Sequence, residues 1–153
     1  GDRPALPMVI RRGTSADIPD LMALEQQAPG AAHWSLEQYQ NIFSGEAPSR
    51  VPLVLKEDGG IQGFIVSRAL DREWEIENIV VSESVRRIGF GSRLLQEFLA
   101  FARAQGAEKI FLEVRESNLA ARRLYEKLGF SESGRRASYY QQPQEAAIVY
   151  HLG

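Results

Sequence analysis

The middle of the chain alternates apolar, β-rich runs with longer segments of helical period. Residues 74–81 precede a helical stripe over 89–106, and the short apolar run 109–114 precedes a second helix over 119–128. Two strands joined by one helix pair in parallel through a right-handed crossover. The nearly continuous apolar character of 109–114 is typical of a strand buried on both faces. This unit predicts an α/β sheet that is at least partly parallel.

Segments on either side of this unit predict antiparallel strands. Runs 51–56 and 61–70 are joined by an Asp-Gly turn of the kind that favours hairpins, and 130 onward pairs with 146–152. Before them, a strand at 8–12 precedes two helices. The first is capped within Thr14-Ser15-Ala16-Asp17, and the second begins at Ser35 and ends at Gly45. We therefore expect a mixed α+β fold: one twisted sheet of about seven strands with about four helices on both faces.

Length and composition limit the class of protein. We expect 153 residues to form a single domain, 1–153, in which 1–7 are a flexible extension. The hydrophobic and charged fractions, 44% and 25%, are those of a globular protein, and a net charge of -2 predicts neither nucleic acid nor a membrane surface as partner. Without cysteine there is no disulfide, thiolate metal site or cysteine nucleophile, and we expect no metal.

The sequence predicts a cytoplasmic location. No apolar run approaches the roughly 20 residues that span a bilayer. The opening Gly1-Asp2-Arg3-Pro4-Ala5 lacks the apolar centre of a signal peptide.

A glycine-containing turn between residues 81 and 92 is the first candidate site. Gly89 and Gly91 let the backbone approach a ligand, and the helix that follows adds unpaired N–H donors and a partial positive charge. Together these features suit a pyrophosphate. The third glycine of a dinucleotide fingerprint is missing at Leu94, and so is the Gly-Lys-Ser/Thr of a P-loop. Taken alone, the glycines are equally consistent with a tight strand-to-helix connection.

Two further residues are candidates for acid–base chemistry. Glu113 stands near the carboxyl end of the apolar strand, where ligands gather in open α/β sheets, and a carboxylate in a partly apolar site can serve as a general base. The structural alternative is an ion pair with Arg115 or another cation. Tyr125 shares a helical stripe with Leu124 and Leu128, so it is either a core aromatic or a phenol that protonates a leaving group.

The turn also carries a family resemblance. Arg-Arg-Ile-Gly-Phe-Gly at 86–91 matches the Arg/Gln-x-x-Gly-x-Gly/Ala pattern, and the chain resembles the GNAT superfamily of acetyltransferases. The resemblance implies the GNAT fold, acetyl-coenzyme A as co-substrate, turn amides that hold its pyrophosphate, and a preceding strand that binds the pantetheine arm and acetyl group. The implied contacts are Ile79, Val80, Val81, Arg86, Arg87, Ile88, Gly89, Phe90, Gly91 and Ser92.

A second resemblance points to one branch of that superfamily. Leu-Glu-Val-Arg-x-Ser-Asn at 112–118 and Leu-Tyr-Glu-x-Leu-Gly-Phe at 124–130 resemble the bacterial ribosomal-protein alanine N-acetyltransferase branch (RimI), as do 33–35 and 135–140. The resemblance implies Glu113 as base, Tyr125 as acid and Asn118 as a coenzyme A contact. This chain departs from the branch at His33, where proline is common, at Arg86, where glutamine is frequent, and after Tyr140.

A competing base remains open. Asp71, Glu73, Glu75 and Glu77 alternate along the strand that leads to the expected acetyl site, so we expect them on one face. In several other GNAT enzymes a glutamate on this strand is the base. We expect Asp71 and Glu73 to be solvated, whereas Glu77 could be the base or attract a cationic substrate.

The expected reaction is direct transfer of the acetyl group to a neutral amine, with the developing oxyanion met by a backbone N–H near Val81. The branch implies the N-terminal α-amine of a protein, with a ribosomal protein as candidate acceptor. The alternatives are an acetyltransferase of small-molecule amines, a non-catalytic acyl-coenzyme A sensor, and an unrelated phosphate-binding module.

Overall fold

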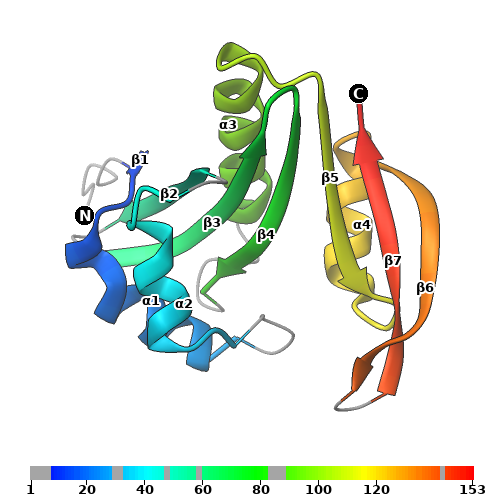
Figure 1. Ribbon diagram of the computed structural model, residues 1–153, viewed down its shortest axis with the longest axis horizontal. Helices are drawn as coiled ribbons and strands as arrows, with labels where there is room; N and C mark the ends of the chain where they lie inside the picture. Colours follow the sequence, from blue (N-terminus) through cyan, green and yellow to red (C-terminus); the bar gives the residue numbers. More distant parts are fainter. Residues whose placement is uncertain (1–7, 29–32, 47–48, 58–59, 83–88, 142–143) are drawn as a thin grey trace, which may run out of the picture.

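A seven-stranded sheet in the order β1-β2-β3-β4-β5-β7-β6 forms the centre of the protein (Figure 1). The computed structural model describes residues 8–28, 33–46, 49–57, 60–82, 89–141 and 144–153. Within these ranges β4 and β5 are parallel and the other neighbouring strands are antiparallel. The predicted mixed sheet and its closing antiparallel pair are confirmed. The predicted extension 1–7 and the Asp-Gly pair at 58–59 lie outside the described residues.

The elements follow the predicted order, and glycines mark several of their ends. Helix α3 ends shortly before Gly106 and α4 before Gly129, both with a positive φ that suits the residue after a helix. Ser35 is the N-cap of α2, and its Oγ accepts from the Gln38 amide. The bounds are β1 Val9–Arg12, the 3-10 turn η1 Ser15–Asp17, α1 Ile18–Gln26, α2 Leu36–Ile42, β2 Ser49–Glu57, β3 Gly60–Leu70, β4 Glu73–Val81, α3 Phe90–Ala104, β5 Lys109–Arg115, α4 Leu119–Lys127, β6 Ser131–Gln141 and β7 Gln144–Leu152.

Helices cover both faces of the sheet because its strands alternate between two cores. Leu55 of β2 and Ile65 of β3 belong to a cluster with Phe98 of α3 and Tyr125 of α4. Their neighbours in the strands, which point the other way, join a second cluster that includes Tyr39 of α2. Figure 1 shows α1 and α2 beside the β1–β4 half and α4 beside β5 and β7.

The strand β5 is buried on one face only, so the prediction of burial on both faces is wrong. Ile110, Leu112 and Val114 are buried, whereas Phe111 and Glu113 are half-exposed. Helices α1 and α2 pack mainly on β2, β3 and β4, and Figure 1 shows them away from β5. The half-covered face carries Glu113.

The strands β4 and β5 are paired only over the first half of β4 and then diverge. Their parallel pairing runs from Glu73 and Lys109 to Ile76 and Leu112, although β4 continues to Val81 and β5 to Arg115. Figure 1 shows the two strands diverging beyond this point. The second half of β4, the start of α3 and the end of β5 border the region where the two strands separate.

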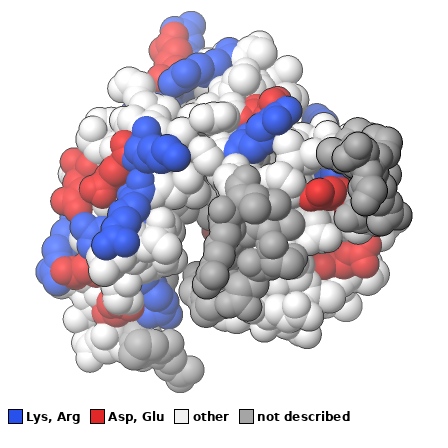
Figure 2. Space-filling view, turned by 180° about the vertical axis from the view of Figure 1, so that it is seen from behind, with Lys and Arg blue, Asp and Glu red and all other residues white. Residues whose placement is uncertain are grey.

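The surface opposite to the view of Figure 1 mixes the two charges. On the side of α4 and β6, Figure 2 shows acidic and basic side chains next to each other. Arg122 of α4 forms an ion pair with Glu132 of β6. This pattern agrees with the small net charge. Among the described residues, no helix is both long and apolar enough to cross a membrane.

Candidate active site

Three glutamates from two strands meet where β4 and β5 diverge. Glu75 is level with Phe111 in the parallel pairing, and Glu113 follows two residues later on the same face of β5. Glu77 lies at an irregularity of β4, where the pairing with β3 steps from Ile76 to Asn78. Burial raises the pKa of Glu75, and the nearby carboxylates of Glu77 and Glu113 raise it further. The expected base and its competitor therefore share one acidic group.

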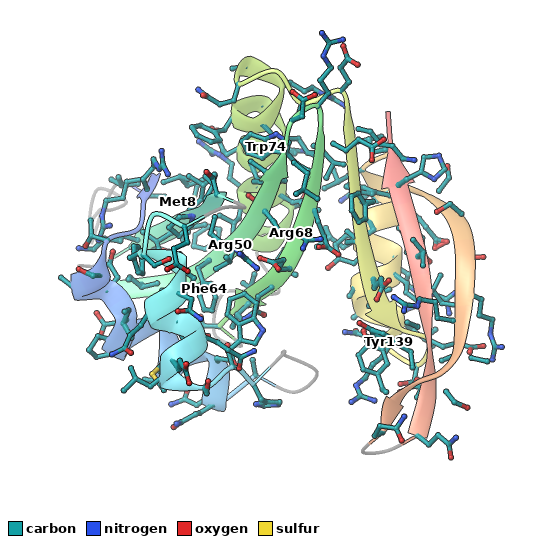
Figure 3. All side chains as sticks on the ribbon, in the orientation of Figure 1. Met8, Arg50, Phe64, Arg68, Trp74 and Tyr139 are labelled. Carbon is teal, nitrogen blue, oxygen red and sulfur yellow. The ribbon has the colours of Figure 1, made fainter. Side chains whose placement is uncertain are left out.

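Each of these carboxylates forms an ion pair with an arginine. Arg68 Nη2 lies 2.7 Å from Glu75 Oε1, and Arg136 Nη1 donates to Glu113 Oε1 at 2.7 Å. Arg50 donates to Glu77 twice, from Nε at 2.8 Å and from Nη2 at 3.1 Å. Figure 3 shows Arg68 between β4 and β5 and Arg50 on the β3 side of β4. The negative charges of these three glutamates are thus neutralised by paired arginines, so in this structure they do not form an unpaired acidic surface for a basic substrate.

Two of the acids expected on this face lie elsewhere or remain in solvent. Asp71 is in the β3–β4 turn with φ 57, so the prediction that it shares the strand face is wrong. The turn has this geometry because Asp71 O accepts from Trp74 Nε1 at 3.2 Å and Asp tolerates a left-handed backbone. Glu73 is exposed at the start of β4, as predicted.

The partner of Glu113 comes from an edge strand and not from its own strand. Arg115 pairs with Glu145 at 3.3 Å, so the cation at Glu113 is not Arg115. Arg136 belongs to β6, which is separated from β5 by β7, and its side chain reaches across β7. Local sequence spacing could not reveal this pair.

An irregularity in β6 brings aromatic side chains to the same place. Arg136 pairs with Ala147 and Tyr140 with Glu145, so four steps along β6 match two along β7. Ser138 inside this bulge has φ 54, a left-handed backbone. Bulges re-aim side chains, and here the Arg136 guanidinium lies 4.3 Å from the centre of the Tyr139 ring. The Glu113 carboxylate, followed by burial, raises the pKa of Tyr139, and Figure 3 shows Tyr139 near the end of β5.

Tyr125 is a buried member of the core. Its ring packs against Phe130 and Tyr150, with ring centres 5.8 and 6.0 Å apart. Burial raises its pKa above the ordinary value, and the neighbouring Tyr140 adds to the rise. The phenol is therefore protonated at neutral pH and lies near the aromatic residues of the bulge. The interpretation of Tyr125 as a core aromatic is confirmed, and its role as a proton donor stays a prediction.

The expected coenzyme A residues fall at the end of β4 and the start of α3. Arg86, Arg87 and Ile88 lie outside the described residues. Gly89 is the N-cap of α3 with φ 80, which favours glycine. A Cβ on Gly91 would lie 3.6 Å from Val81 Cγ2 and 3.7 Å from Leu124 Cδ2. The sites of Val81 and Gly91 are thus close together, next to α4.

Asn118 has a structural role that the sequence did not indicate. It is the N-cap of α4, and its Oδ1 accepts from the Ala121 amide at 3.2 Å. As the N-cap, Asn118 lies at the N-terminal end of α4, shortly after the end of β5.

Glu25, a buried glutamate that was not predicted as important, links the α1–α2 connection to β4. Glu25 of α1 accepts from the Trp34 amide and the Tyr39 hydroxyl. Its Oε2 also accepts from Asn78 Nδ2 at 2.9 Å, one residue before the expected acetyl site. Burial raises the pKa of Glu25. The sequence did carry one signal for this burial: Glu25 occupies a position on the apolar side of α1.

Comparison with known proteins supports one family. Residues 17–130 match the model of the Acetyltransferase (GNAT) family. The chain is 33% identical over 144 residues to the [ribosomal protein bS18]-alanine N-acetyltransferase of Haemophilus influenzae, covering 92% of this chain and 95% of that one. The crystal structure of the ribosomal-protein-S18-alanine N-acetyltransferase from Escherichia coli superimposes with a TM-score of 0.86 at 29% identity, over 95% and 93% of the two chains. Arabidopsis thaliana NAA60 in complex with acetyl-CoA shares the fold, with a TM-score of 0.82 at 17% identity over 95% and 99%.

Proposed function

The chain belongs to the GNAT family of acetyltransferases and is an N-acetyltransferase that uses acetyl-coenzyme A, and we propose that its acceptor is the N-terminal α-amine of a protein. The relatives that act on the alanine of ribosomal protein bS18 support a ribosomal protein as the acceptor. The observation that carries the proposal is Glu113 on the half-exposed face of β5, next to Tyr139 and near Glu75 of β4. An α-amine on a flexible chain end can reach such a position.

The proposed base is Glu113. An amine attacks only as the free base, and an α-amine, with a pKa of about 8, loses its proton more readily than lysine, at about 10.4. Glu113 takes this proton directly or through one water. Bound acetyl-coenzyme A supplies the thioester, whose carbonyl carbon accepts the nitrogen lone pair. A backbone N–H near Val81 stabilises the oxyanion that develops there.

Tyr125 is the proposed acid. As the C–S bond breaks, its hydroxyl gives a proton to the sulfur, and the amide and the free thiol leave. The nitrogen loses its second proton as the intermediate collapses to the amide, and this proton, passed through water, restores the phenol. The first amine proton, held by Glu113, returns to solvent. Burial raises the pKa of Tyr125, so the phenol still carries its proton when the thiolate forms beside it.

We assign coenzyme A binding to the junction of β4 and α3. The assigned residues are Ile79, Val80, Val81, Arg86, Arg87, Ile88, Gly89, Phe90, Gly91 and Ser92, with Asn118. Support comes from the left-handed Gly89 at the N-terminus of α3 and from the closeness of Gly91 to Val81. Such a helix end favours phosphate groups.

The decisive experiment measures thiol release and product mass with three acceptors: a basic peptide with a free N-terminal alanine, the same peptide already acetylated there, and spermidine. We expect transfer to the free peptide alone. Transfer to spermidine or to an internal lysine, with the free N-terminus ignored, would favour the small-amine alternative. Thiol release with any acceptor would exclude the sensor alternative.

A further inference from the structure

Of the three arginines that pair with the site's carboxylates, Arg136 is the one held least firmly. Its side chain is 56% exposed, against 31% for Arg68 and 28% for Arg50. It gives Glu113 one hydrogen bond, whereas Arg50 gives Glu77 two. A long, exposed side chain loses little burial when it moves. The pair at Glu113 therefore opens at the lowest cost.

The position that Arg136 occupies is the one that an incoming amine needs. A base must lie within about 2.6–3.2 Å of the atom whose proton it takes. The Arg136 nitrogen already stands 2.7 Å from Glu113 Oε1. An arginine keeps its protons in proteins, so this contact cannot start the reaction. The guanidinium and an acceptor's ammonium cannot both bind this oxygen.

We propose that Arg136 fills the acceptor's ammonium subsite in the free enzyme, and that the acceptor binds by displacing it. This inference rests on the proposed function, in which Glu113 is the base. The exchange replaces one cation with another, so the half-buried Glu113 carboxylate is not left without a partner. A displaced guanidinium can remain on the face of Tyr139, over which it already lies at 4.3 Å. Arg136 is thus an internal competitor of the acceptor for the Glu113 carboxylate.

The kinetic test compares Arg136→Gln with wild type on the free N-terminal alanine peptide. Removing the internal competitor should lower KM about two- to fivefold, the range of an exposed ion pair, and leave kcat unchanged. Arg136→Lys keeps the cation and should return KM to near the wild-type value. Arg136→Met, a second uncharged variant, should behave like Arg136→Gln.

The chain offers a matched control in the neighbouring residue. Arg135 has the same 56% exposure and pairs with a carboxylate at 2.9 Å, but that carboxylate is Glu116, beyond the end of β5. Arg135→Gln should leave KM unchanged. A higher KM in Arg136→Gln would mean that Arg136 binds the acceptor, and an unchanged KM would mean a surface pair without function. Either result overturns the inference.

A second measurement needs no acetyl transfer. Methylguanidinium, titrated into the coenzyme A complex and followed by NMR, should bind Arg136→Gln saturably and compete with the peptide. It should bind wild type far more weakly, and it should not bind Glu113→Gln/Arg136→Gln. Equal binding to wild type and Arg136→Gln would also refute the subsite. Failure of the proposed function would appear separately, as wild type that acetylates no peptide N-terminus.

Discussion

The two sides of the site hold similar carboxylates in different ways. Glu77 on β4 and Glu113 on β5 are about equally exposed, 17% and 20% of the side chain. Their partners differ: Arg50 comes from the neighbouring β2–β3–β4 layer with two bonds, whereas Arg136 comes from the edge strand β6 with one. Burial of the acid alone does not distinguish the two candidate bases. The exposure of the arginine partner and its number of hydrogen bonds do distinguish them, and both favour Glu113.

The largest effect should come from neutralising the two glutamates in turn. Glu113→Gln removes the proposed base and should lower kcat by about 10²–10⁴-fold at neutral pH. Glu77→Gln should lower it by less than about tenfold, because its carboxylate is already committed to Arg50. Steady-state rates with the free alanine peptide measure both. The reverse ranking would transfer the base role to β4.

Removing the Tyr125 hydroxyl should have the next largest effect on turnover. Tyr125→Phe keeps the packing on Phe130 and Tyr150 but deletes the proposed proton donor, and we expect kcat to fall by about 10²-fold with acetyl-coenzyme A affinity unchanged. Tyr150→Phe is the matched control. It deletes a neighbouring buried hydroxyl that accepts from Arg122 Nε at 3.0 Å, outside the proposed chemistry.

Equal losses of turnover in Tyr125→Phe and Tyr150→Phe would show that the aromatic cluster acts only by packing. Calorimetry with acetyl-coenzyme A separates this outcome from impaired binding.

The sequence predicts elements well and partners poorly, for a physical reason. The order of strands and helices follows from local periodicity, and the ends of α3 and α4 follow from Gly106 and Gly129. The Arg68–Glu75 pair was within reach, because the two residues are opposite in the β3–β4 hairpin. The Arg136–Glu113 pair was not, because it depends on the strand order β5-β7-β6 and on the bulge at Ser138.

Burial was the other quantity that local pattern could not supply. The apolar run of β5 suggested two covered faces, yet α1 and α2 pack on β2 to β4 and leave the Glu113 face half-exposed. The same tertiary arrangement buries Glu25, an acid that sequence composition would assign to the surface. Both outcomes are set by where helices dock on the sheet.

The β4 side should lose stability when its buried anchor is removed. Glu25→Ala leaves the Trp34 amide, the Tyr39 hydroxyl and the Asn78 amide without this acceptor, and should lower the free energy of unfolding by about 2 kcal/mol. Urea denaturation measures the loss. Hydrogen exchange should increase in 33–43 and at the end of β4 and remain unchanged in β5 and β6, which would confirm that the two sides are held separately.

The same anchor gives a pH dependence of known sign. Burial raises the pKa of Glu25 above 4.5 in the folded protein, so folding favours its protonated form. Its contribution to stability is complete below pH 4.5 and falls as pH rises through the folded pKa. Glu25→Gln removes this contribution, so its stability relative to wild type should rise from pH 4.5 towards neutrality. A constant difference across that window would contradict the assignment.

The smallest effect should separate the two arginine partners by stability alone. Arg50→Gln leaves Glu77 half-buried and without its two hydrogen bonds, and should lower the free energy of unfolding by about 1 kcal/mol. Arg136→Gln should leave the urea midpoint unchanged, because exposed ion pairs contribute little and Glu113 can be solvated from its open side. Arg135 is equally exposed, so Arg135→Gln serves as the control that should leave the urea midpoint unchanged. If Arg136→Gln destabilised the protein as much as Arg50→Gln, the β5–β6 pair would be a fixed structural contact, and the difference between the two sides would disappear.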